Sequence, residues 1–335
     1  MSSFNRPKIS VIIPVHNGGA KFRKCLQSLA ASDTTPEEVI VASDGDSDGS
    51  WRLAEKFGAH VLRIPSRKGP AHARNLGAKT ATGDILFFFD ADVTIPEDAM
   101  SRVVDTFLRN PELAALFGSY DDEPFEVNFL SQYKNLFHHY GHQTAKEEAY
   151  TFWSGCGAIR REVFLTMGGF DEGYQGPTIE DIDLGYRLRK AGYRIRLVKE
   201  LQVKHLKRWG VISLLKADFL YRALPWTNLI LNEGQFIDDL NVNLSGRLSV
   251  IFTFVLLSTL CGALWFPWLL VPAVVCVMGL LIINRDLYRF FQKKRGWSFA
   301  LQSIPWHWAY FFYSGIAFAI GFAKHWLKRP GTRIR

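Results

Sequence analysis

The sequence is poor in cysteine, and it lacks the patterns of several well-defined protein classes. Its four cysteines show no paired spacing, which indicates reduced thiols rather than a disulfide framework or a zinc site. The first ten residues contain no apolar run, so we expect no cleavable signal peptide and a cytoplasmic amino-terminal domain. No zinc-finger, helix-turn-helix or RNA-recognition pattern is present, so nucleic acid is not an expected partner.

Acidic residues are moderately outnumbered by basic residues. Lysine and arginine number 40 against 32 aspartates and glutamates, which gives a formal net charge of +8, and 48% of the residues are hydrophobic. Such an excess of positive charge suits phosphate-bearing substrates or the anionic face of a membrane. The length of 335 residues allows one large domain or two ordinary ones.

From Ile9 to about Leu201, short apolar runs alternate with segments of helical periodicity. Strands are expected over residues 9–15, 37–43, 59–65 and 84–90, with helices over residues 21–32, 50–58 and 69–83. Apolar strands separated by helices of this length predict an α/β fold, with a mostly parallel sheet covered by helices on both faces. Ligands of such sheets bind beyond the carboxyl ends of the strands.

Two carboxylates follow one of these strands, in "DILFFFDADV" from Asp84 to Val93. Asp90 and Asp92 are two residues apart, so in an extended chain they point to the same side. Two such anions repel each other unless a cation joins them. We therefore expect Mg²⁺ or Mn²⁺, held by these carboxylates together with a substrate diphosphate. A solvated acidic loop is the alternative.

Two further polar stretches fall near the same edge of the predicted sheet. Asp44, Asp46 and Asp48 follow the second strand, where they can hydrogen-bond a base or ribose, although Asp and Gly also favour plain turns. The stretch "SRKGPAHARNLGA" combines cationic side chains with a helix N-terminus, which favours an anionic phosphate. A solvated basic face is the alternative for this stretch.

These motifs, in this order, resemble the family 2 glycosyltransferases with the GT-A fold. The resemblance rests on "SVIIPVHNGG", "SDGDSDGS", "GPAHARNLGAKTATGDILFFFDADV", "GCGAIRREVFLTMGGFDE" and "EDIDLGYRLRKAGYRI", and it spans roughly Lys8 to His205. It implies a Rossmann-like GT-A sheet and inverting transfer of a sugar from a UDP- or GDP-linked donor, usually with Mg²⁺ or Mn²⁺.

The resemblance also implies which residues bind the donor and the metal. The residues expected to bind the nucleotide sugar are Pro14, Val15, Asn17, Asp44, Lys68, Arg74, Asn75, Asp90 and Ala91. The expected metal ligands are Asp92, Asp90 and His205, although a lone histidine is also often structural. This chain departs from the family pattern at Ser43, where Asp is common, and at Gly18–Gly19, where an acidic residue is common. Both departures leave the choice of nucleotide open.

A second carboxylate cluster opens the helix predicted for "TIEDIDLGYRLRKAG". Asp181 shares a face with apolar residues, whereas Asp183 lies about 200° away and is expected to be solvated or structural. The resemblance implies that Asp181 is the general base and that Glu180 is its neighbour in the catalytic site. Charge that simply favours a helix N-terminus is the alternative. On the acceptor side we expect Trp153 and Gly155, with Trp153 either stacking on a sugar or packing in the core.

Beyond about Lys199 the composition becomes that of a membrane-associated chain. Residues 208–231 mix apolar residues with Arg and Lys, which favours interfacial helices over a helix pair inside the soluble fold. Leu248–Ile283 is uncharged and long enough for two short spans broken near Trp265–Trp268, and Ser303–Ala323 is a third span or a re-entrant segment. The expected domains are a GT-A domain at 1–205, interfacial helices at 206–246 and a membrane domain of two to three transmembrane helices at 247–335.

The sequence therefore predicts a multi-pass membrane glycosyltransferase of the hexosyltransferase class, with its catalytic domain in the cytoplasm. It is expected to move one sugar to a hydroxyl of a lipid or lipid-linked saccharide. Two alternatives stay open: a polyprenyl-phosphate glycosyltransferase, whose acceptor needs no base, and a non-catalytic nucleotide-binding membrane protein. Whether the chain forms a homo-oligomer is also left open.

Overall fold

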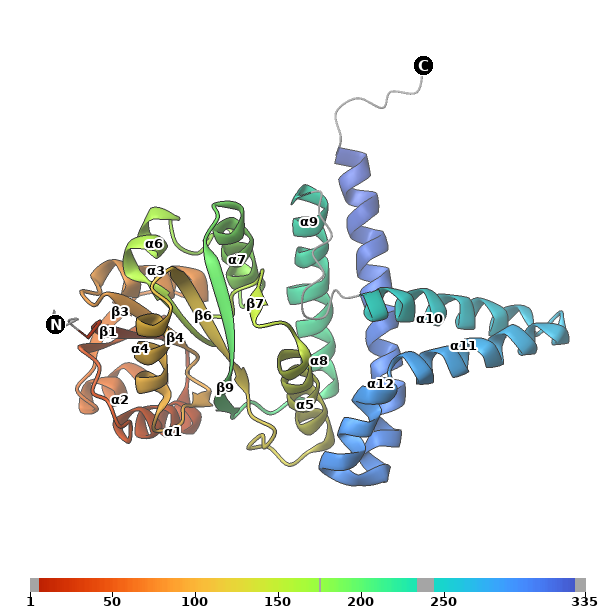
Figure 1. Cartoon of the computed structure of the whole chain (residues 1–335), viewed down its shortest axis with the longest axis horizontal. Coiled ribbons are helices and arrows are strands. Elements are labelled where there is room, and N and C mark those ends of the chain that lie inside the picture. The colour runs from red at the N-terminus through yellow and green to blue at the C-terminus, as the bar shows by residue number, and fades with distance from the viewer. Residues whose placement is uncertain (1–5, 175, 234–243, 329–335) are drawn as a thin grey trace, which may run out of the picture. The chain divides into compact units, whose positions relative to one another are not determined.

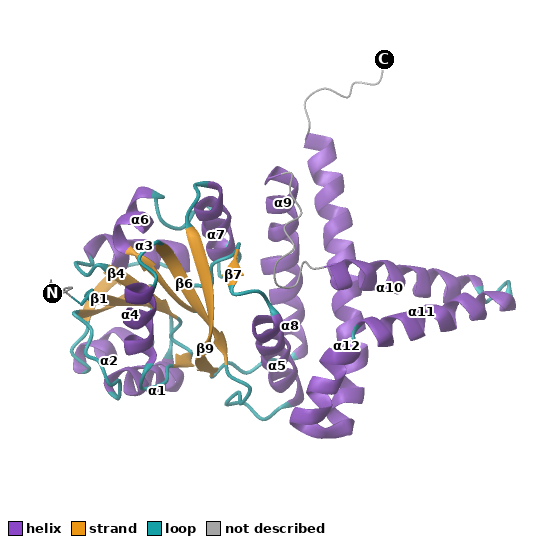
Figure 2. Ribbon diagram, viewed as in Figure 1, coloured by secondary structure: helices purple, strands orange, loops and turns teal. Residues whose placement is uncertain are grey.

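The computed structural model describes residues 6–174, 176–233 and 244–328. Its contacts divide the chain into two compact units, Met1–Trp209 and Gly210–Arg335. The first unit alternates strands and helices, and the described residues of the second unit form only helices and short connections (Figure 1, Figure 2).

One nine-stranded sheet forms the centre of the first unit. Its strands are β1 (Ile9–Val15), β2 (Glu38–Asp44), β3 (His60–Ile64), β4 (Ile85–Phe89), β5 (Val93–Thr94), β6 (Leu113–Tyr120), β7 (Glu148–Ala149), β8 (Cys156–Arg160) and β9 (Arg194–His205). The spatial order is β3-β2-β1-β4-β8-β6-β9-β5, and β7 pairs with β9 outside this path. The first four strands in this order are mutually parallel, and β6 and β9 run in the same direction as they do. The predicted mostly parallel sheet is thus confirmed, with β8, β5 and β7 antiparallel to it.

Helices cover both faces of this sheet, as the sequence predicts. The helices of the first unit are α1 (Gly19–Ala30), α2 (Ser50–Lys56), α3 (Pro70–Thr80), α4 (Ala99–Arg109), α5 (Phe129–Thr144), α6 (Arg161–Thr166) and α7 (Glu180–Lys190). One core cluster packs α1, α2 and α4 against one face, and a second packs α3, α6 and α7 against the other. All five residues of β4 are buried, because apolar side chains on both sides of the strand face a helical layer.

The parallel order of β2, β1 and β4 brings the carboxyl ends of these strands to one edge. Each strand ends beside a predicted motif: β1 before Asn17, β2 at Asp44, and β4 immediately before Asp90. The loops that carry these residues therefore lie together, at the edge where open α/β sheets bind ligands.

The second unit is helical. Its elements are α8 (Val211–Lys216), the π-helix η1 (Ala217–Ala223), α9 (Leu224–Glu233), α10 (Leu244–Gly262), the short 3₁₀ turn η3 (Pro267–Leu269), α11 (Leu270–Ile283) and α12 (Arg285–Lys328). The predicted interfacial region at 206–246 includes α8, η1 and α9, and its residues 234–243 lie outside the described residues. The division into interfacial and membrane domains stays a prediction.

The expectation of two to three spans is not supported by the helix lengths. Among the described residues, only α10 is by itself long and apolar enough to cross a membrane. A second span would require Pro267–Ile283 and Arg285–Leu327 to act as one, although they are bent by 61°. The break near Trp265–Trp268 leaves α11 only 14 residues, about 21 Å of helix, which is short for a bilayer core of about 30 Å.

The predicted third span, Ser303–Ala323, lies in the helical part of α12 that follows a break in the chain. It lies within α12, which begins with the charged residues that follow Asn284 and is interrupted at Gly296, whose φ is +82°. Its tryptophan, tyrosine and histidine residues make this stretch less apolar than α10.

Candidate active site

Asp92 and His205 are brought together by strand pairing. The two residues of β5 pair antiparallel with the end of β9, so that Val93 lies opposite His205. The Leu206 N–H donates to the Asp92 carbonyl over 2.8 Å, which fixes the two segments further. As a result, Asp92 Oδ2 lies 3.9 Å from His205 Nε2. The histidine ring is buried and stacks on Tyr120 at a centroid distance of 4.4 Å, so it is held in a fixed orientation.

The side chains at this position suit a divalent ion that takes only some of its ligands from the protein. The side chains of Asp90 and Asp92 are about one-third exposed, at 34% and 33%, so both can be reached from outside. Within residues 6–174, 176–233 and 244–328, no three Asp, Glu, His or Cys side chains are grouped closely enough to hold an ion by themselves. Mg²⁺ in nucleotide-dependent enzymes is typically held by one or two carboxylates plus substrate phosphates and water. Asp92 offers one such carboxylate with His205 Nε2 beside it, and the metal-binding roles of Asp92, His205 and Asp90 all stay predictions.

Arg74 joins the two acidic clusters of the site. From α3, its Nη2 donates to Asp90 Oδ1 over 2.6 Å and its Nη1 donates to Glu180 Oε1 over 2.9 Å. Burial acts to lower the pKa of Arg74, but the charges of Asp90, Glu180 and Asp181 outweigh it and raise the pKa. The guanidinium is 5% exposed and committed to two carboxylates, so its predicted contact with the ribose or diphosphate stays a prediction.

Glu180 and Asp181 lie in the first turn of α7, where the helix dipole favours negative charge. The Ser154 N–H and hydroxyl donate to Asp181 Oδ2 at 3.0 and 3.1 Å, and the Ile182 N–H donates to Oδ1 at 2.9 Å. Burial raises the pKa of Asp181, and the Ser154 hydrogen bonds and the Arg74 charge oppose it only in part. Burial and the neighbouring charge of Asp181 also raise the pKa of Glu180, against the opposing charge of Arg74.

Asp183, expected to be solvated or structural, is structural. Its Oδ2 accepts from Arg187 Nε over 2.8 Å. The same guanidinium donates to the carbonyls of Met167 and Gly169, so Asp183 helps to anchor the loop that precedes α7.

Asp44 receives hydrogen bonds from the loop before α3. Its two carboxylate oxygens accept the backbone N–H groups of Lys68 and Gly69 at 2.6 and 2.8 Å, and its side chain is buried. Each oxygen retains a lone pair, so the predicted contact with the base stays open. Lys68 itself is exposed, and its backbone is held at this edge by the bond to Asp44.

The residues after β1 differ in what they offer a nucleotide. Val15 is buried in the core, so only its backbone can face a ligand, whereas Pro14 and Ala91 are partly exposed. Asn17 is exposed and has a positive φ of 52°. Its Oδ1 accepts the Ser47 N–H over 2.8 Å, which ties the turn after β1 to the aspartate-rich turn after β2.

Asn75 fastens the loop that leads towards α7. Its Nδ2 donates to the Phe170 carbonyl and to Glu172 Oε1, and its Oδ1 accepts the Phe170 N–H, all within 2.8 to 2.9 Å. Glu172 also pairs with His72 Nδ1 at 2.7 Å. The predicted donor contact of Asn75 stays a prediction, since these three bonds use its buried amide.

Replacing Asn75 by alanine is expected to lower the free energy of unfolding by about 2 to 4 kcal/mol, because the buried N–H and C=O of Phe170 both lose their partner. Urea-induced unfolding followed by tryptophan fluorescence measures the change. Thr166→Ala, an exposed position nearby, is the control and is expected to stay within about 0.5 kcal/mol of wild type. Equal stability of the two variants would show that the Asn75 bonds do not hold the loop.

Trp153 packs in an aromatic cluster and also covers Gly155. Its ring lies 4.7 Å from that of Tyr120 and contacts both core clusters. A Cβ at Gly155 would come within 2.6 Å of the Trp153 ring, so glycine is required for this packing. The core-packing interpretation of Trp153 accounts for these contacts, and its stacking on an acceptor sugar stays a prediction.

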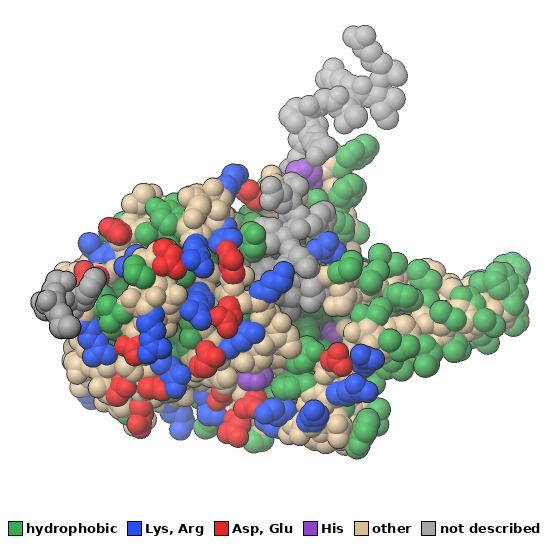
Figure 3. Space-filling view, viewed as in Figure 1, with side chains coloured by type: hydrophobic (Ala, Val, Ile, Leu, Met, Phe, Trp, Pro, Cys, Tyr) green, Lys and Arg blue, Asp and Glu red, His purple; other side chains and the backbone are tan. Residues whose placement is uncertain are grey.

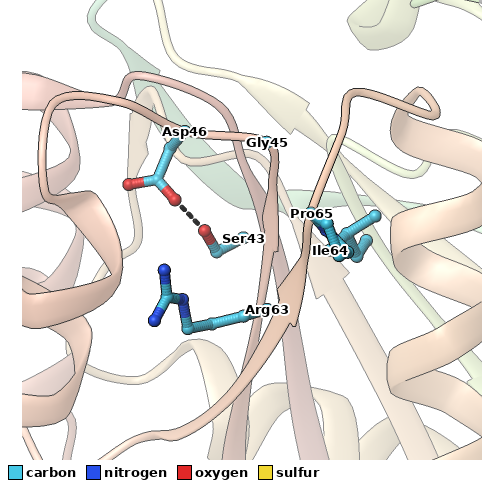
Figure 4. A pocket seen from close by; sticks show the side chains of 6 residues that line it. All are labelled: Ser43, Gly45, Asp46, Arg63, Ile64 and Pro65. Atoms are coloured by element: carbon cyan, nitrogen blue, oxygen red, sulfur yellow. Dashed lines mark hydrogen bonds between the residues drawn. The ribbon is translucent and has the colours of Figure 1, made fainter.

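A cavity of about 220 Å³ lies at the ends of β2 and β3, lined by Ser43, Gly45, Asp46, Arg63, Ile64 and Pro65. Ser43 donates to Asp46, and both lie on the same side of the strands as Arg63 (Figure 4). Successive residues of a strand face opposite ways, so the Asp44 side chain next to Ser43 points away from this cavity. The Asp44 carboxylate therefore does not line this cavity, whereas Asp46, which can also hydrogen-bond a base or ribose, does.

Sequence reasoning missed three polar residues that hold the site together: Ser154, His72 and Glu172. Ser154 contacts the carboxylate of Asp181 from 27 residues away, and Glu172 reaches α3 across about a hundred residues. The "GFDE" stretch belongs to one of the quoted motifs, but nothing in its spacing indicates these partners.

Comparisons with known proteins agree with this arrangement. Residues 10–168 match the family described as Glycosyl transferase family 2, and residues 134–209 match the N-terminal domain of galactosyltransferase. The uncharacterised glycosyltransferase YfnE of Bacillus subtilis is 27% identical over 279 residues, which are 66% of this chain and 71% of that protein. The glucosyl-dolichyl phosphate glucuronosyltransferase of Haloferax volcanii is 26% identical over 179 residues, 49% of this chain and 56% of the relative.

Among solved structures, the mannosyltransferase PcManGT from Pyrobaculum calidifontis, in complex with GDP-Man and Mn²⁺, has a TM-score of 0.59 at 18% identity. The match covers 97% of this chain and 89% of that one, and it shows the GT-A fold. The match to glycosyl transferase family 2 lies within the first unit and covers slightly under half of the chain.

Proposed function

We propose that the protein is an inverting glycosyltransferase that moves one sugar from a UDP- or GDP-linked donor to a hydroxyl of a lipid or lipid-linked saccharide. The observation that carries the proposal is the bridge Asp90–Arg74–Glu180. It connects the carboxylates after β4, where a diphosphate and its metal would bind, with the pair of acids at the start of α7. The predicted donor site and Glu180, the neighbour of the candidate base Asp181, thus share one buried cation.

Asp181 takes the role of general base in this proposal. Its carboxylate accepts the proton of the acceptor hydroxyl as the oxygen forms a bond to the anomeric carbon. The bond between that carbon and the diphosphate oxygen breaks on the opposite face, so the configuration inverts. The Ser154 hydrogen bonds hold Asp181 in place, and Arg74 keeps Glu180 and Asp90 ordered beside it.

A divalent metal, Mg²⁺ or Mn²⁺, would be held by Asp92 and His205, with Asp90 beside them. When bound, such an ion stabilises the negative charge that develops on the leaving diphosphate. Lys68 is exposed at the same edge and is suited to neutralise phosphate charge.

Membrane attachment is proposed through the second unit, with residues 1–205 as the cytoplasmic catalytic domain, 206–246 at the interface and 247–335 as the membrane domain. Supporting it, α10 is long and apolar enough for a span, and the side chains of the α10–α11 hairpin in Figure 3 are largely hydrophobic. An acceptor carried by a lipid suits an enzyme attached in this way, and the Haloferax relative is named for a dolichyl-phosphate-linked sugar.

The raised pKa values of Asp181 and Glu180 predict how transfer depends on pH. A base acts only when ionised, so kcat/KM is expected to fall as the pH drops through a pKa above the ordinary value of about 3.9. Ser154→Ala removes a donor that favours the ionised form, and its acidic limb should therefore move to higher pH. Ser101→Ala on α4, which removes a hydroxyl that donates to Asp33, serves as the control. An acidic limb that stays in place in Ser154→Ala would contradict the assignment of Asp181 as the titrating base.

The proposal as a whole is tested with purified protein in lipid, supplied with a panel of UDP- and GDP-sugars and Mg²⁺ or Mn²⁺. Donor hydrolysis and transfer to extracted lipids are both measured. Metal-dependent turnover of one donor, with a glycolipid product, is the expected result. Binding of a nucleotide sugar without turnover of any donor in the panel would instead favour a non-catalytic binding protein.

A further inference from the structure

The cavity at the ends of β2 and β3 holds a carboxylate and a guanidinium on the same side of the sheet. Ser43 and Arg63 are partners in the register of the two parallel strands, so their side chains leave the same face, and Asp46 lies on that side as well (Figure 4). The volume of about 220 Å³ is below the roughly 300 to 1,000 Å³ of sites that enclose a whole drug-sized ligand. The cavity therefore suits one ring system rather than a complete nucleotide sugar.

Arg63 carries hydrogen-bond donors for which the described part of the chain supplies no acceptor. Its guanidinium carbon lies 4.1 Å from the centroid of the Trp51 ring, a cation–π contact that holds the group without an acceptor. Within residues 6–174, 176–233 and 244–328, the Arg63 side chain forms no ion pair and no hydrogen bond. Since the residue is exposed, its N–H groups can be reached by a ligand.

Asp46 is the more accessible carboxylate at the end of β2. The Ser43 hydroxyl donates to its Oδ1, and the Trp51 N–H donates to its Oδ2 over 3.3 Å. Each carboxylate oxygen has two lone pairs, so both can accept one bond more. The Asp44 side chain, by contrast, is buried and already accepts two backbone N–H groups.

The cavity lies at the same edge of the sheet as Asp90 and Asp92. Only β1 separates β2 from β4, and β3 is the next strand outward. Neighbouring strands are about 4.8 Å apart, so the ends of β2 and β3 are about 10 and 15 Å from the end of β4. The base of a nucleoside diphosphate lies at a similar distance from its terminal phosphate. A donor whose diphosphate binds beside Asp92 can thus place its base in the cavity.

We propose that the cavity binds guanine, which makes the donor a GDP-linked rather than a UDP-linked sugar. Guanine presents two adjacent donors, N1–H and N2–H, to the Asp46 carboxylate, and two acceptors, O6 and N7, to the Arg63 guanidinium. Uracil has a single N–H donor on its pairing edge and leaves one carboxylate oxygen unused. A bidentate arginine contact to O6 and N7 is also the commonest specific contact to guanine. The inference rests on the proposed function and narrows its donor to one nucleotide.

The test is calorimetry of the full chain in detergent with Mg²⁺ and three nucleotides: GDP, UDP and inosine diphosphate, which is GDP without the 2-amino group. Wild type is expected to bind GDP about tenfold to a hundredfold more tightly than either of the others, the range for a bidentate contact to guanine or a hydrogen bond to a charged group.

Asp46→Asn replaces an acceptor by a donor. The Ser43 hydroxyl can accept as well as donate, so the amide can keep both local bonds. This variant should prefer xanthosine diphosphate, whose C2 carbonyl accepts from the amide. An unfolded variant could not show such a gain.

Arg63→Gln should weaken GDP binding about tenfold, since the bidentate contact to O6 and N7 is lost. Arg52→Gln is the matched control. It removes the other cation over the Trp51 ring, at 4.8 Å, but Arg52 does not line the cavity, so GDP should bind as in wild type.

Equal binding of GDP and inosine diphosphate by wild type, or tighter binding of UDP, overturns the inference while the proposed sugar transfer stands. A preference for GDP that is unchanged in both Asp46→Asn and Arg63→Gln places the base elsewhere and overturns it as well. Folded wild type that binds none of these nucleotides removes the donor site of the proposed function itself, and the inference with it.

Discussion

Asp181→Asn is expected to lower the rate of sugar transfer to a hydroxyl acceptor by about 10²- to 10⁴-fold, the range that a positioned general base contributes. The amide cannot take the acceptor proton, but it keeps the size of the carboxylate and can still accept the Ser154 N–H. Nucleotide-sugar affinity, measured by calorimetry, should change little. The loss should therefore be in kcat, measured at saturating donor and acceptor.

Asp183→Asn provides the matched control on the same helix. This variant removes a carboxylate that lies two residues from Asp181 and pairs with Arg187. It leaves the acids proposed for catalysis intact, so the rate of transfer should remain within a few-fold of wild type. If Asp181→Asn transfers to a polyprenyl phosphate at the wild-type rate, no base is needed. The polyprenyl-phosphate alternative would then replace the hydroxyl acceptor.

Much of the first unit could be predicted because its strands are short apolar runs that stand out in the sequence. The apolar run before Asp90 and the turns after β1 and β2 predict a parallel sheet, and parallel neighbours bring their carboxyl ends to one edge. The insertion of β8 between β4 and β6, antiparallel to both, has no such local signal. The position of β8 depends on long-range strand pairing in the folded chain.

The partners of the site residues could not be predicted for the same reason. Asp92 meets His205 only because a two-residue strand pairs with the end of β9 in one register. Arg74 reaches acids 16 and 106 residues further along the chain, and sequence spacing carries no information about the second of these. The resemblance to family 2 implied which residues bind the donor and the metal. Only the folded chain shows that the side-chain amide of Asn75 hydrogen-bonds the backbone of a loop at Phe170.

The expectation of two to three spans found only partial support, for a different reason. The uncharged length of Leu248–Ile283 suggested two crossings, and the helix break does fall at the predicted tryptophans and proline. What length alone does not reveal is how many residues the connection uses. Seven residues between α10 and α11 leave too few for the second helix to span.

Asp92→Asn is expected to abolish the metal dependence of turnover and to lower kcat/KM by about 10²- to 10³-fold, which corresponds to about 3 to 4 kcal/mol of transition-state stabilisation. The amide is a weaker and uncharged ligand, so the protein side of the proposed metal site keeps only His205 and the neighbouring Asp90. The fold should be preserved, because the bond that joins this segment to β9 uses the Asp92 backbone carbonyl and not its side chain. Titration of Mn²⁺ by electron paramagnetic resonance, with and without the nucleoside diphosphate, measures the loss directly.

Asp105→Asn on α4 removes an equally negative side chain whose ion pairs, at 3.9 Å, are long and exposed. It controls for the change in net charge and should bind Mn²⁺ as wild type does. Because Asp92 and His205 offer only two donors, Mn²⁺ should bind weakly to wild type alone and tightly only when the diphosphate is present. Tight binding without the diphosphate, unchanged in Asp92→Asn, would place the ion elsewhere on the protein. Turnover in the presence of a chelator, equal in both proteins, would instead assign the stabilisation of the leaving diphosphate to Lys68 and the other cations at this edge.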